Sequence, residues 1–455
     1  MKKVLNLQLV LLIFLLFSCS SSHSSNDTDI LPDSDADSDD VETQDDDLDH
    51  QDSEIVDDLD ETPETDSDSD TEGTVSDDDK PNETTEEIFE KTEPINGYKR
   101  CYDKIPAGAY EGFFANPHIE SSVKLGLGYD YYDDYEIKEE DLEKVQEITV
   151  YSQDLRGLEK LVNLKKIQIS GENVYDFTPL SGLTKLKELI LYSEYMTCLD
   201  GSISLLTNLK TLEISETKLK DVSPIEQLVN LKTLELGENQ IEVLPKDLAN
   251  LQKLEFLSFV HNNVKDITPL KSLINLKELF FHYNYIEDIS PINGLVNLTS
   301  FGAQGNQIKD ISAVTNLENL TYLALNQNQI EEIPEEIENL KKLQEIQLKF
   351  NKIRNLPSLY GLESLKKLQL SHNELDDKDL LQLGNLEKLE FLYVAVNNKI
   401  TKVPVMKNLK SLQELYLNYN SITDLSGFAD NESFPALKRL DIRVKQNRRC
   451  RSIQE

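Results

Sequence analysis

The chain has 455 residues, and its 84 Asp and Glu outnumber its 46 Lys and Arg, which gives a formal net charge of −38. Most of this charge lies between Asn26 and Glu93, where 31 acidic residues stand against two lysines, so residues 95–455 carry only −11. Binding to nucleic-acid phosphates requires a basic footprint, so this charge balance predicts no nucleic-acid partner.

Residues 1–18 read MKKVLNLQLVLLIFLLFS, two lysines followed by an apolar run. This pattern predicts a secretory signal peptide, whereas a transmembrane anchor is disfavoured by Asn6, Gln8 and the serine-rich segment that follows. Residues 16–19, LFSC, resemble the lipobox of bacterial lipoproteins. That resemblance implies that Cys19 is lipidated and becomes the mature N-terminus. We therefore expect an exported protein held to a membrane by its N-terminal lipid, at the outer membrane or cell surface.

Residues 19–95 combine this anchor with a low-complexity tract of Asp, Ser, Glu and Thr. Such a tract has little to bury and repels itself, so we expect a disordered acidic tether with a span of roughly 45 Å or more. The segment DSDADSDD at Asp33 is similar in spacing to calcium-binding loops. Those loops need a glycine for the turn and a closing glutamate, and Gly73 is the only glycine in the tract, so specific calcium sites are not expected.

Residues 96–142 are rich in aromatic residues and lie outside the period that follows them. The first coil of a repeat array leaves an apolar face open, so this segment is predicted to be an N-terminal cap, with a helix over residues 137–145. The tyrosines of GYDYYDDY at Gly128 are expected to pack on the first coil rather than to bind a ligand.

From residue 143 to residue 436, one pattern recurs roughly every 22 residues, as in LKTLELGENQIEVLP at Leu231. Leu234 and Leu236 alternate with Glu235, as a short strand requires, and Leu231 and Ile241 point into the same coil interior. This spacing is that of a leucine-rich repeat. It predicts an α/β solenoid, a horseshoe with a parallel β-sheet on the concave side and short 3₁₀ or helical segments on the convex side. About 14 units are expected, the last beginning at residue 437 and ending in a basic tail at residue 455.

An asparagine follows the strand in most units and is predicted to bond the turn backbone within and between coils. The predicted ladder comprises Asn239, Asn262, Asn284, Asn306, Asn328, Asn351, Asn373, Asn397 and Asn420. Gln153, Glu172, Glu194 and Thr217 take this position in the first four units, so the ladder is expected to be imperfect there.

The return segments also repeat, as in DITPL at Asp266 and DISPI at Asp288. Their Ser or Thr before Pro predicts a helical turn with a hydroxyl N-cap. EVLPKDLANL at Glu242 and EEIPEEIENL at Glu331 favour a longer, helix-containing return. The repeats with these returns, and the segment IKEEDLEKVQEIT that precedes them, resemble the internalin-like leucine-rich repeat proteins of bacterial surfaces.

No pattern in the chain indicates catalysis or a cofactor, so we expect neither an enzyme nor a bound cofactor. His261 and His282 come from adjacent coils, but no third ligand is placed by the spacing, and no metal site is predicted. Among Cys101, Cys198 and Cys450, a pair between Cys101 and Cys450 is excluded by the length of the stack, and a pair between Cys101 and Cys198 is left open.

Aromatic side chains occur at outward positions of many strands, where a soluble repeat protein normally carries polar groups. The predicted partner-binding residues are Phe256, His261, Phe280, His282, Tyr283, Tyr322, Phe350, Phe391, Tyr393, Tyr416 and Tyr419. Exposed aromatic residues on adjacent strands usually mark a partner site, although they also stabilise a sheet by stacking. We therefore expect a surface-anchored recognition or adhesion scaffold that binds an unknown protein ligand, possible sources being a host or a neighbouring cell, through its concave face. A glycan or cell-wall binding module is the alternative.

Overall fold

The computed structural model describes residues 90–91, 94–99, 101, 104–105, 114, 116–130, 134–406, 408–428 and 434–443. The predicted signal peptide, Cys19, nearly all of the acidic tether, and Cys450 with the basic tail lie outside these residues. Within them, no helix combines the length and apolar character needed to cross a membrane.

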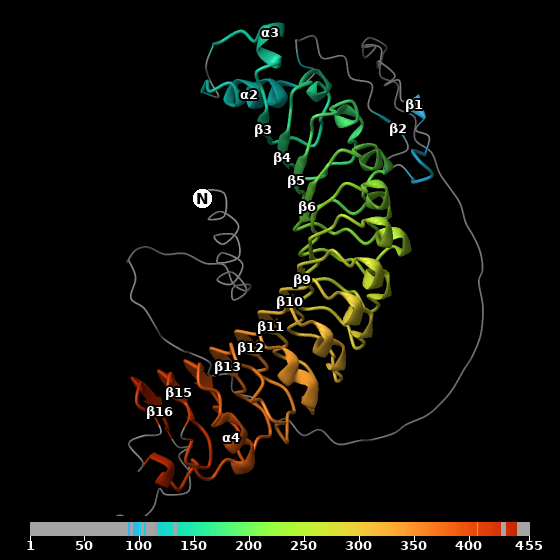
Figure 1. Ribbon diagram of the computed structural model, residues 1–455. Coiled ribbons are helices and arrows are strands. Elements are labelled where there is room, and N and C mark those ends of the chain that lie inside the picture. Colours follow the sequence, from blue (N-terminus) through green and yellow to red (C-terminus); the bar gives the residue numbers. More distant parts are fainter. Residues whose placement is uncertain are drawn as a thin grey trace, which may run out of the picture. The chain divides into compact units, whose positions relative to one another are not determined.

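The array is built on one parallel sheet of 14 strands that follow one another in chain order, which confirms the predicted solenoid (Figure 1). The strands are β3 (Glu147–Val150), β4 (Lys166–Ser170), β5 (Glu188–Tyr192), β6 (Thr211–Ser215), β7 (Thr233–Glu235), β8 (Phe256–Ser258), β9 (Glu278–Phe280), β10 (Ser300–Gly302), β11 (Tyr322–Ala324), β12 (Glu345–Gln347), β13 (Lys367–Gln369), β14 (Phe391–Tyr393), β15 (Glu414–Tyr416) and β16 (Arg439–Asp441). A separate pair, β1 (Glu90–Lys91) and β2 (Lys104–Ile105), is antiparallel.

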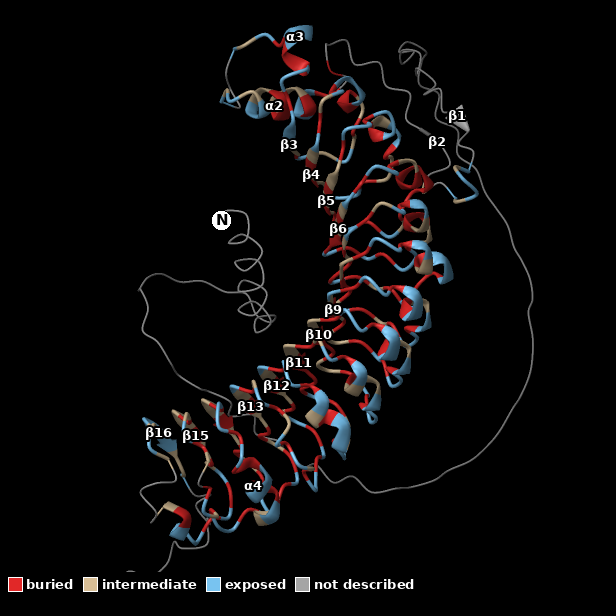
Figure 2. Cartoon of the chain, viewed as in Figure 1, coloured by how far each residue is buried: buried red, intermediate tan, exposed pale blue. Residues whose placement is uncertain are grey.

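The leucine positions of each coil face inward and form a continuous core along the array (Figure 2). In the coil of β7, Leu231, Leu234, Leu236 and Ile241 are all 0% exposed. Burial of one such side chain stabilises the fold by roughly 2 kcal/mol. Each coil alone would leave this apolar surface open, so the neighbouring coils supply the second wall of every layer.

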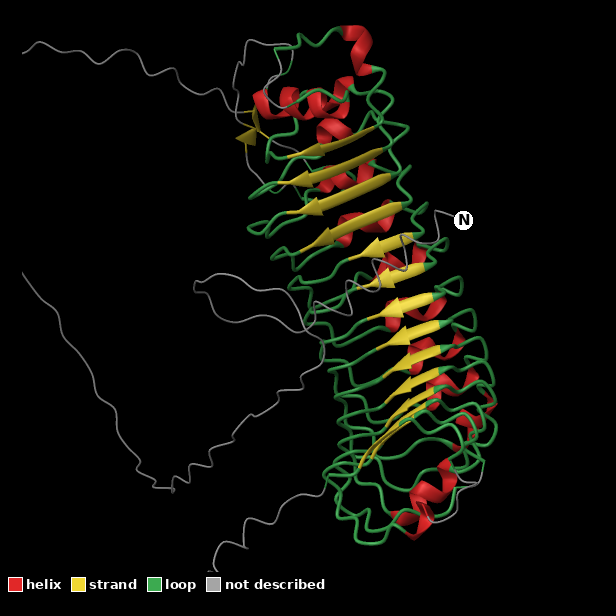
Figure 3. Cartoon of the chain, turned by 90° about the vertical axis from the view of Figure 1, so that its left-hand side faces the viewer, coloured by secondary structure: helices red, strands yellow, loops and turns green. Residues whose placement is uncertain are grey.

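The convex side carries short 3₁₀ turns, also as predicted, and Figure 3 shows them behind the sheet. They are η1 (Leu158–Lys160), η2 (Thr178–Leu180), η3 (Gly201–Leu205), η4 (Ser223–Gln227), η5 (Lys246–Asn250), η6 (Thr268–Ser272), η7 (Ser290–Gly294), η8 (Ser312–Asn316), η9 (Glu335–Asn339) and η10 (Ser426–Phe428).

The prediction that a Ser or Thr hydroxyl caps these turns is wrong. In DITPL, Asp266 Oδ1 accepts hydrogen bonds from the backbone N–H of Thr268, at 2.8 Å, and from the Thr268 hydroxyl, at 2.5 Å. The carboxylate two residues before the turn is therefore the cap, because it accepts bonds that a hydroxyl would accept more weakly. Thr268 instead donates to it.

The returns at Glu242 and Glu331 are also shorter than expected. They form the 3₁₀ turns η5 and η9, of the same five-residue length as their neighbours. An α-helix occurs instead at α4 (Asp377–Leu383), where the side chain of Asp376 accepts from the backbone N–H groups of Lys378 and Asp379. The capping box at this helix start satisfies free N–H groups that a 3₁₀ turn would leave open.

The asparagine ladder is confirmed, and Asn306 shows its bonding. Its Nδ2 donates to the carbonyls of Phe281, in the preceding coil, and Ala303, in its own coil, at 3.0 and 3.1 Å. Its Oδ1 accepts from the N–H of Ile286, also in the preceding coil, at 3.0 Å. One amide thus satisfies donors and acceptors of two coils in a buried turn.

The ladder begins differently from the sequence-based assignment. Glu194 is exposed, and the buried hydroxyl of Ser193 accepts from the N–H of Val174 in the preceding coil. Thr217 is buried as predicted and donates its hydroxyl to Oδ1 of Asn239. In the coils of β5 and β6, short hydroxyl side chains therefore take the role that asparagine has in later coils.

Two elements close the first coil. Helix α2 (Pro117–Gly126) packs on β3 and buries Ile119 and Val123, and α3 (Glu139–Leu142) lies within the predicted helix at residues 137–145. Asn116 caps α2 by accepting from the N–H of His118. Tyr135 packs partly against the core and donates its hydroxyl to Asp141, in keeping with a packing role for this tyrosine.

Residues 94–99 and Cys101 form a strap on the convex side, farther along the array. Cys101 is bonded to Cys198, which decides the pairing that the sequence left open. The backbone N–H of Cys101 also donates to Asp200, Asn96 donates to Ser204, and Tyr98 donates to Glu226. The strap thus joins the coils that contain η3 and η4.

Replacing Asn306 by alanine should lower the free energy of unfolding by about 1–3 kcal/mol, because buried turn groups in two coils lose their partners. The control is Lys271→Ala, which removes an exposed side chain from η6 and should lower the free energy of unfolding far less. Denaturant titration of both variants checks this. Equal midpoints for the two would contradict the structural role of the ladder.

Candidate functional site

The candidate site is the concave face, which we define by four positions in each coil: the two outward residues of the strand and the two outward residues after it. In β9 these are Glu278, Phe280, His282 and Tyr283. Residues between them, such as Leu279 and Phe281, point inward and are 0% exposed. Because the strands pair in register, equivalent positions line up in rows along the array.

A central aromatic cluster occupies this face on β8 and β9. Phe256 and Phe280 have ring centroids 6.0 Å apart, and Phe280 lies 5.9 Å from the ring of His282. His261 stacks on Tyr283 at 4.4 Å. Five of the predicted residues are therefore brought together, as their register on adjacent strands implies.

Two glycines of the β10 coil, one on the strand and one after it, make room for these rings. A Cβ at Gly302 would come within 2.4 Å of the His282 ring, and one at Gly305 within 2.5 Å of the Tyr283 ring. Gln304, between them, donates from its backbone N–H to His282 Nδ1 at 2.9 Å and from its side chain to the Tyr283 hydroxyl at 2.7 Å. The sequence analysis missed these three residues, although two glycines within LTSFGAQGNQI are an unusual signal for a strand.

The two histidines of this cluster, His261 and His282, come from adjacent coils. Burial, and to a smaller extent the neighbouring His261, lower the pKa of His282 to about 4. Nδ1 of His282 accepts a hydrogen bond, in keeping with a neutral ring. Within the part of the chain that the structure describes, no three His, Cys, Asp or Glu side chains are grouped as metal ligands.

The other predicted residues form a second group toward the C-terminal end. Tyr393 stacks on Tyr416 at 4.7 Å, and Arg439 lies 5.1 Å above the Tyr416 ring. Phe350 and Tyr419 are 38% and 44% exposed. Their ring neighbours differ, because Phe350 lies against His372 and Lys349, whereas Tyr419 lies beneath Arg443.

Tyr322 and Phe391 stand apart from these ring pairs in register. Tyr322 lies in the first row of β11, two strands beyond β9, and burial raises its pKa to about 12. Phe391 lies in the first row of β14 between Lys367 and Glu414. In the row of Phe280, the two aromatic areas are therefore separated by Gly302, Ala324, Gln347 and Gln369.

An acidic patch adjoins the central aromatic cluster on the other side, and the sequence analysis missed it. It consists of Glu213 on β6 and Glu235 on β7, which are register partners. Glu213 accepts from the hydroxyl of Tyr192, and Glu235 accepts from the N–H of Gly237 at 3.1 Å. Burial raises the pKa of Glu235 to about 7, and the negative charge of Glu213 acts in the same direction. Glutamates at outward strand positions, in TLEIS and TLELG, were the available signal.

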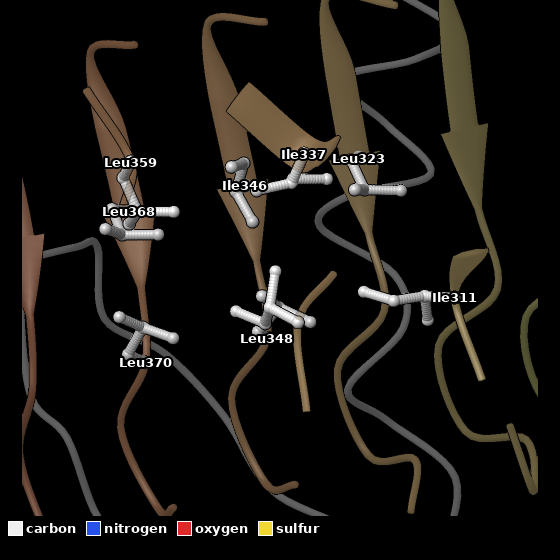
Figure 4. Close-up of a pocket in the computed structure, with 9 residues that line it drawn as sticks. Ile311, Leu323, Ile337, Ile346, Leu348, Leu359, Leu368 and Leu370 are labelled. Carbon is white, nitrogen blue, oxygen red and sulfur yellow. The ribbon is translucent and has the colours of Figure 1, made fainter. Parts of the chain in front are cut away.

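An open groove and a small interior cavity lie along the described part of the array. An open groove of about 410 Å³ runs beside the central aromatic cluster at the end of the strands, lined by His261, Asn263, Tyr283, Tyr285 and Gly305 among others. The second, in the interior near β11 to β13, is lined by isoleucine and leucine side chains and measures about 10 Å³ (Figure 4). An apolar space of that size offers no partner to a water molecule or ligand.

Comparison with known proteins matches the repeats to two family models. One, described as a leucine-rich repeat region, matches residues 294–440, and one described as leucine-rich repeats in two copies matches residues 207–253 and 252–294. Together they cover residues 207–440, from just after η3 into β16.

Solved structures of similar proteins share the fold. An internalin (inlF) from Listeria monocytogenes is 29% identical over 74% of this chain and 97% of its own, with a TM-score of 0.64. The plant peptide hormone receptor RGFR1, in complex with RGF2, is 22% identical over 67% of this chain and 53% of its own, with a TM-score of 0.56. The repeat ectodomain of GASSHO1/SCHENGEN3 from Arabidopsis thaliana is 20% identical over 68% and 40%, with a TM-score of 0.56.

Glu235 should make stability depend on pH. Its pKa is raised from 4.5 to about 7 on folding, so the unfolded chain releases this proton first, and the wild type loses stability as pH rises from about 4.5 to 7. The variant Glu235→Gln lacks this loss. The unfolding free energy of the variant minus that of the wild type should therefore rise across that window. The rise is at most about 1.4 kcal/mol for each unit of pKa shift.

Denaturant titrations at pH 5, 6, 7 and 8, chosen as roughly even steps across this window, test this. Glu238→Gln, which removes an exposed carboxylate from the same coil, is the control for the loss of one charge. Parallel pH profiles for the wild type and Glu235→Gln would contradict the assignment.

Proposed function

Since this chain is a leucine-rich repeat protein with an internalin-like array, we propose that it is a surface-anchored scaffold that binds another protein through its concave face. Array proteins of this kind are typically interaction scaffolds without catalytic activity, and no catalytic role is part of this proposal. The partner is expected outside the cell, at a host or neighbouring-cell surface.

The observation that carries the proposal is the central aromatic cluster. Phe256 and Phe280 are only half-buried and His261 is exposed, although they lie in the middle of the sheet face where polar residues would be compatible with the fold. Contiguous apolar surface of this kind usually marks a binding site. Aromatic residues near the centre of an interface contribute most to affinity, because a partner shields them completely from water.

The strap also leaves the aromatic cluster uncovered, because its described residues, 94–99 and Cys101, contact the convex side. They are held against the coils of η3 and η4 by the Cys101–Cys198 bond and by hydrogen bonds to Asp200, Ser204 and Glu226.

A glycan or cell-wall ligand is the second candidate, and the groove beside the aromatic cluster favours it. The groove combines the stacked rings of His261 and Tyr283 with the exposed ring of Tyr285 and the amide of Asn263. Rings that stack on a sugar face and amides that bond its hydroxyls suit a small polar ligand. A sugar would depend on this groove, whereas a protein would also depend on Phe280.

Phe280→Ala should weaken binding of the protein partner by about 2 kcal/mol or more and should leave the fold nearly intact. The full chain is immobilised and used to capture protein from the surface of intact cells, and the captured protein is titrated against both forms. Tyr360→Ala, which removes a ring that is 71% exposed on a return segment, is the matched control.

Two results would contradict the protein-binding proposal. The first is a large loss of stability in Phe280→Ala with normal affinity for each folded molecule, which would assign the cluster to packing. The second is binding on a glycan array that depends on Tyr283 and is insensitive to Phe280→Ala, which would favour the sugar ligand.

The anchor is proposed from LFSC at residues 16–19 and has its own test. Cys19→Ala should release the protein from membranes or block its maturation, because the lipid on Cys19 is the proposed attachment. Membrane fractionation and the mass of the mature N-terminus measure this. Unchanged fractionation together with an N-terminus that carries no acyl group would exclude a lipid anchor.

A further inference from the structure

Two carboxylates stand side by side on the concave face without a cation between them. Glu213 and Glu235 occupy the same row on the paired strands β6 and β7, whose spacing is about 4.8 Å. Their hydrogen-bond donors are neutral: the hydroxyl of Tyr192 for Glu213, and the side chain of Ser258 with the backbone N–H groups of Leu236 and Gly237 for Glu235. Among the described residues, no Lys or Arg forms an ion pair with either carboxylate.

A third group on the same patch lacks a partner altogether. Ser215 follows Glu213 by two residues on β6, so its side chain leaves the same face of the sheet. Ser215 is only 7% exposed, and its Oγ is the one buried side-chain oxygen or nitrogen in the described part of the chain that has no hydrogen-bond partner. A buried hydroxyl without a partner is costly, and it marks a place where a polar ligand atom could be accommodated.

The surrounding charge is negative over several strands. At the four concave positions of each coil from β6 to β11 there is no Lys or Arg, whereas Glu216, Glu238 and Glu278 accompany the two central carboxylates. Of the lysines that directly precede the strands, Lys232 and Lys277 are bonded to Glu255. A basic group from outside would therefore meet an uncompensated field.

We propose that the patch formed by Glu213, Ser215 and Glu235 receives an arginine side chain of the protein partner. A guanidinium group is planar and carries five N–H donors in a fixed fork, so it can bond two neighbouring carboxylates and still reach a hydroxyl. An ammonium group has three donors at one point and spans the pair less well. This inference rests on the proposed protein-binding function and adds the chemistry of the partner.

The electrostatics of the free protein favour such a ligand. Burial, and to a smaller extent the charge of Glu213, raise the pKa of Glu235, so a second negative charge on the patch is unfavourable. A bound cation removes this repulsion and favours the ionised carboxylates. The site therefore gains more from a cation than an exposed glutamate pair would.

The neighbouring aromatic cluster adds a distance constraint on the partner. Phe256 and Phe280 lie one and two strands beyond Glu235, that is about 5 and 10 Å along the array. An extended chain that crosses the strands rises about 3.3 Å per residue, so an arginine and an apolar residue two or three positions apart would reach both sites. The partner segment is thus expected to be basic and apolar together.

The test uses two probe peptides and the full chain. The first is Gly-Arg-Gly-Phe-Gly with fluorine on the phenylalanine ring, and the second has citrulline, which is neutral and of the same shape, in place of arginine. Their affinities are measured by fluorine NMR titration at low ionic strength. The arginine peptide should bind the wild type about tenfold more tightly, as expected for charge-assisted hydrogen bonds.

The protein variant Glu213→Gln/Glu235→Gln should bind both peptides equally while its denaturation midpoint is not lowered. The matched control, Glu318→Gln/Glu336→Gln, removes two exposed carboxylates from return segments and should retain the tenfold preference. Equal loss of preference in both double variants would overturn the proposal, because the effect would then be one of total charge. A wild type without any preference for arginine would overturn it as well.

Calcium chloride and sodium chloride at matched ionic strength separate a metal site from an arginine site. Equal displacement of the arginine peptide by the two salts supports the proposal, and far stronger displacement by calcium overturns it. The proposed function is judged separately, because a captured protein that depends on Phe280 and not on Glu235 would leave protein binding intact and remove only the arginine site.

Discussion

The structure depends on the lateral pairing of coils, because no coil can bury its own leucines or satisfy its own turn. Leu234 needs the wall supplied by the next coil, and the turn around Asn306 needs an amide that bonds to carbonyls in two coils. Both requirements repeat with the same spacing, so the fold is a stack in which each layer supports only its neighbours. Replacing one ladder residue therefore removes hydrogen bonds from two coils.

This arrangement separates stability from recognition. Side chains alternate along each strand, so inward positions such as Leu279 are restricted to apolar residues, whereas outward positions such as Phe280 are nearly free to vary. Adjacent strands lie about 4.8 Å apart, and outward side chains of neighbouring coils are therefore close enough to act together. Rings, glycines and carboxylates at these positions form surfaces without disturbing the core.

The concave face is an example of how such surfaces depend on each other. The rings of His282 and Tyr283 lie over Gly302 and Gly305, whose missing Cβ atoms admit them. Next to the rings, Glu213 and Glu235 share a row, and burial, together with the charge of Glu213, raises the pKa of Glu235. Apolar and acidic areas thus adjoin on one rigid sheet. A partner that matches only one area would leave the other in water.

Much of the fold was determined by the sequence alone, because the repeat period, the inward leucines and the asparagine ladder are local patterns that recur. The outward direction of Phe280 followed from alternation in the same way. Tertiary structure was needed wherever two coils of different sequence meet. Only the register shows that Glu213 faces Glu235 and that Gly302 lies under His282, and only the path of the strap brings Cys101 to Cys198. Likewise, Ser193 rather than Glu194 takes the ladder position, because the contact with the neighbouring coil decides which of the two side chains is buried. A pattern within one coil predicts which way a side chain points, but its neighbours are set by a coil about 22 residues away and are decided by packing.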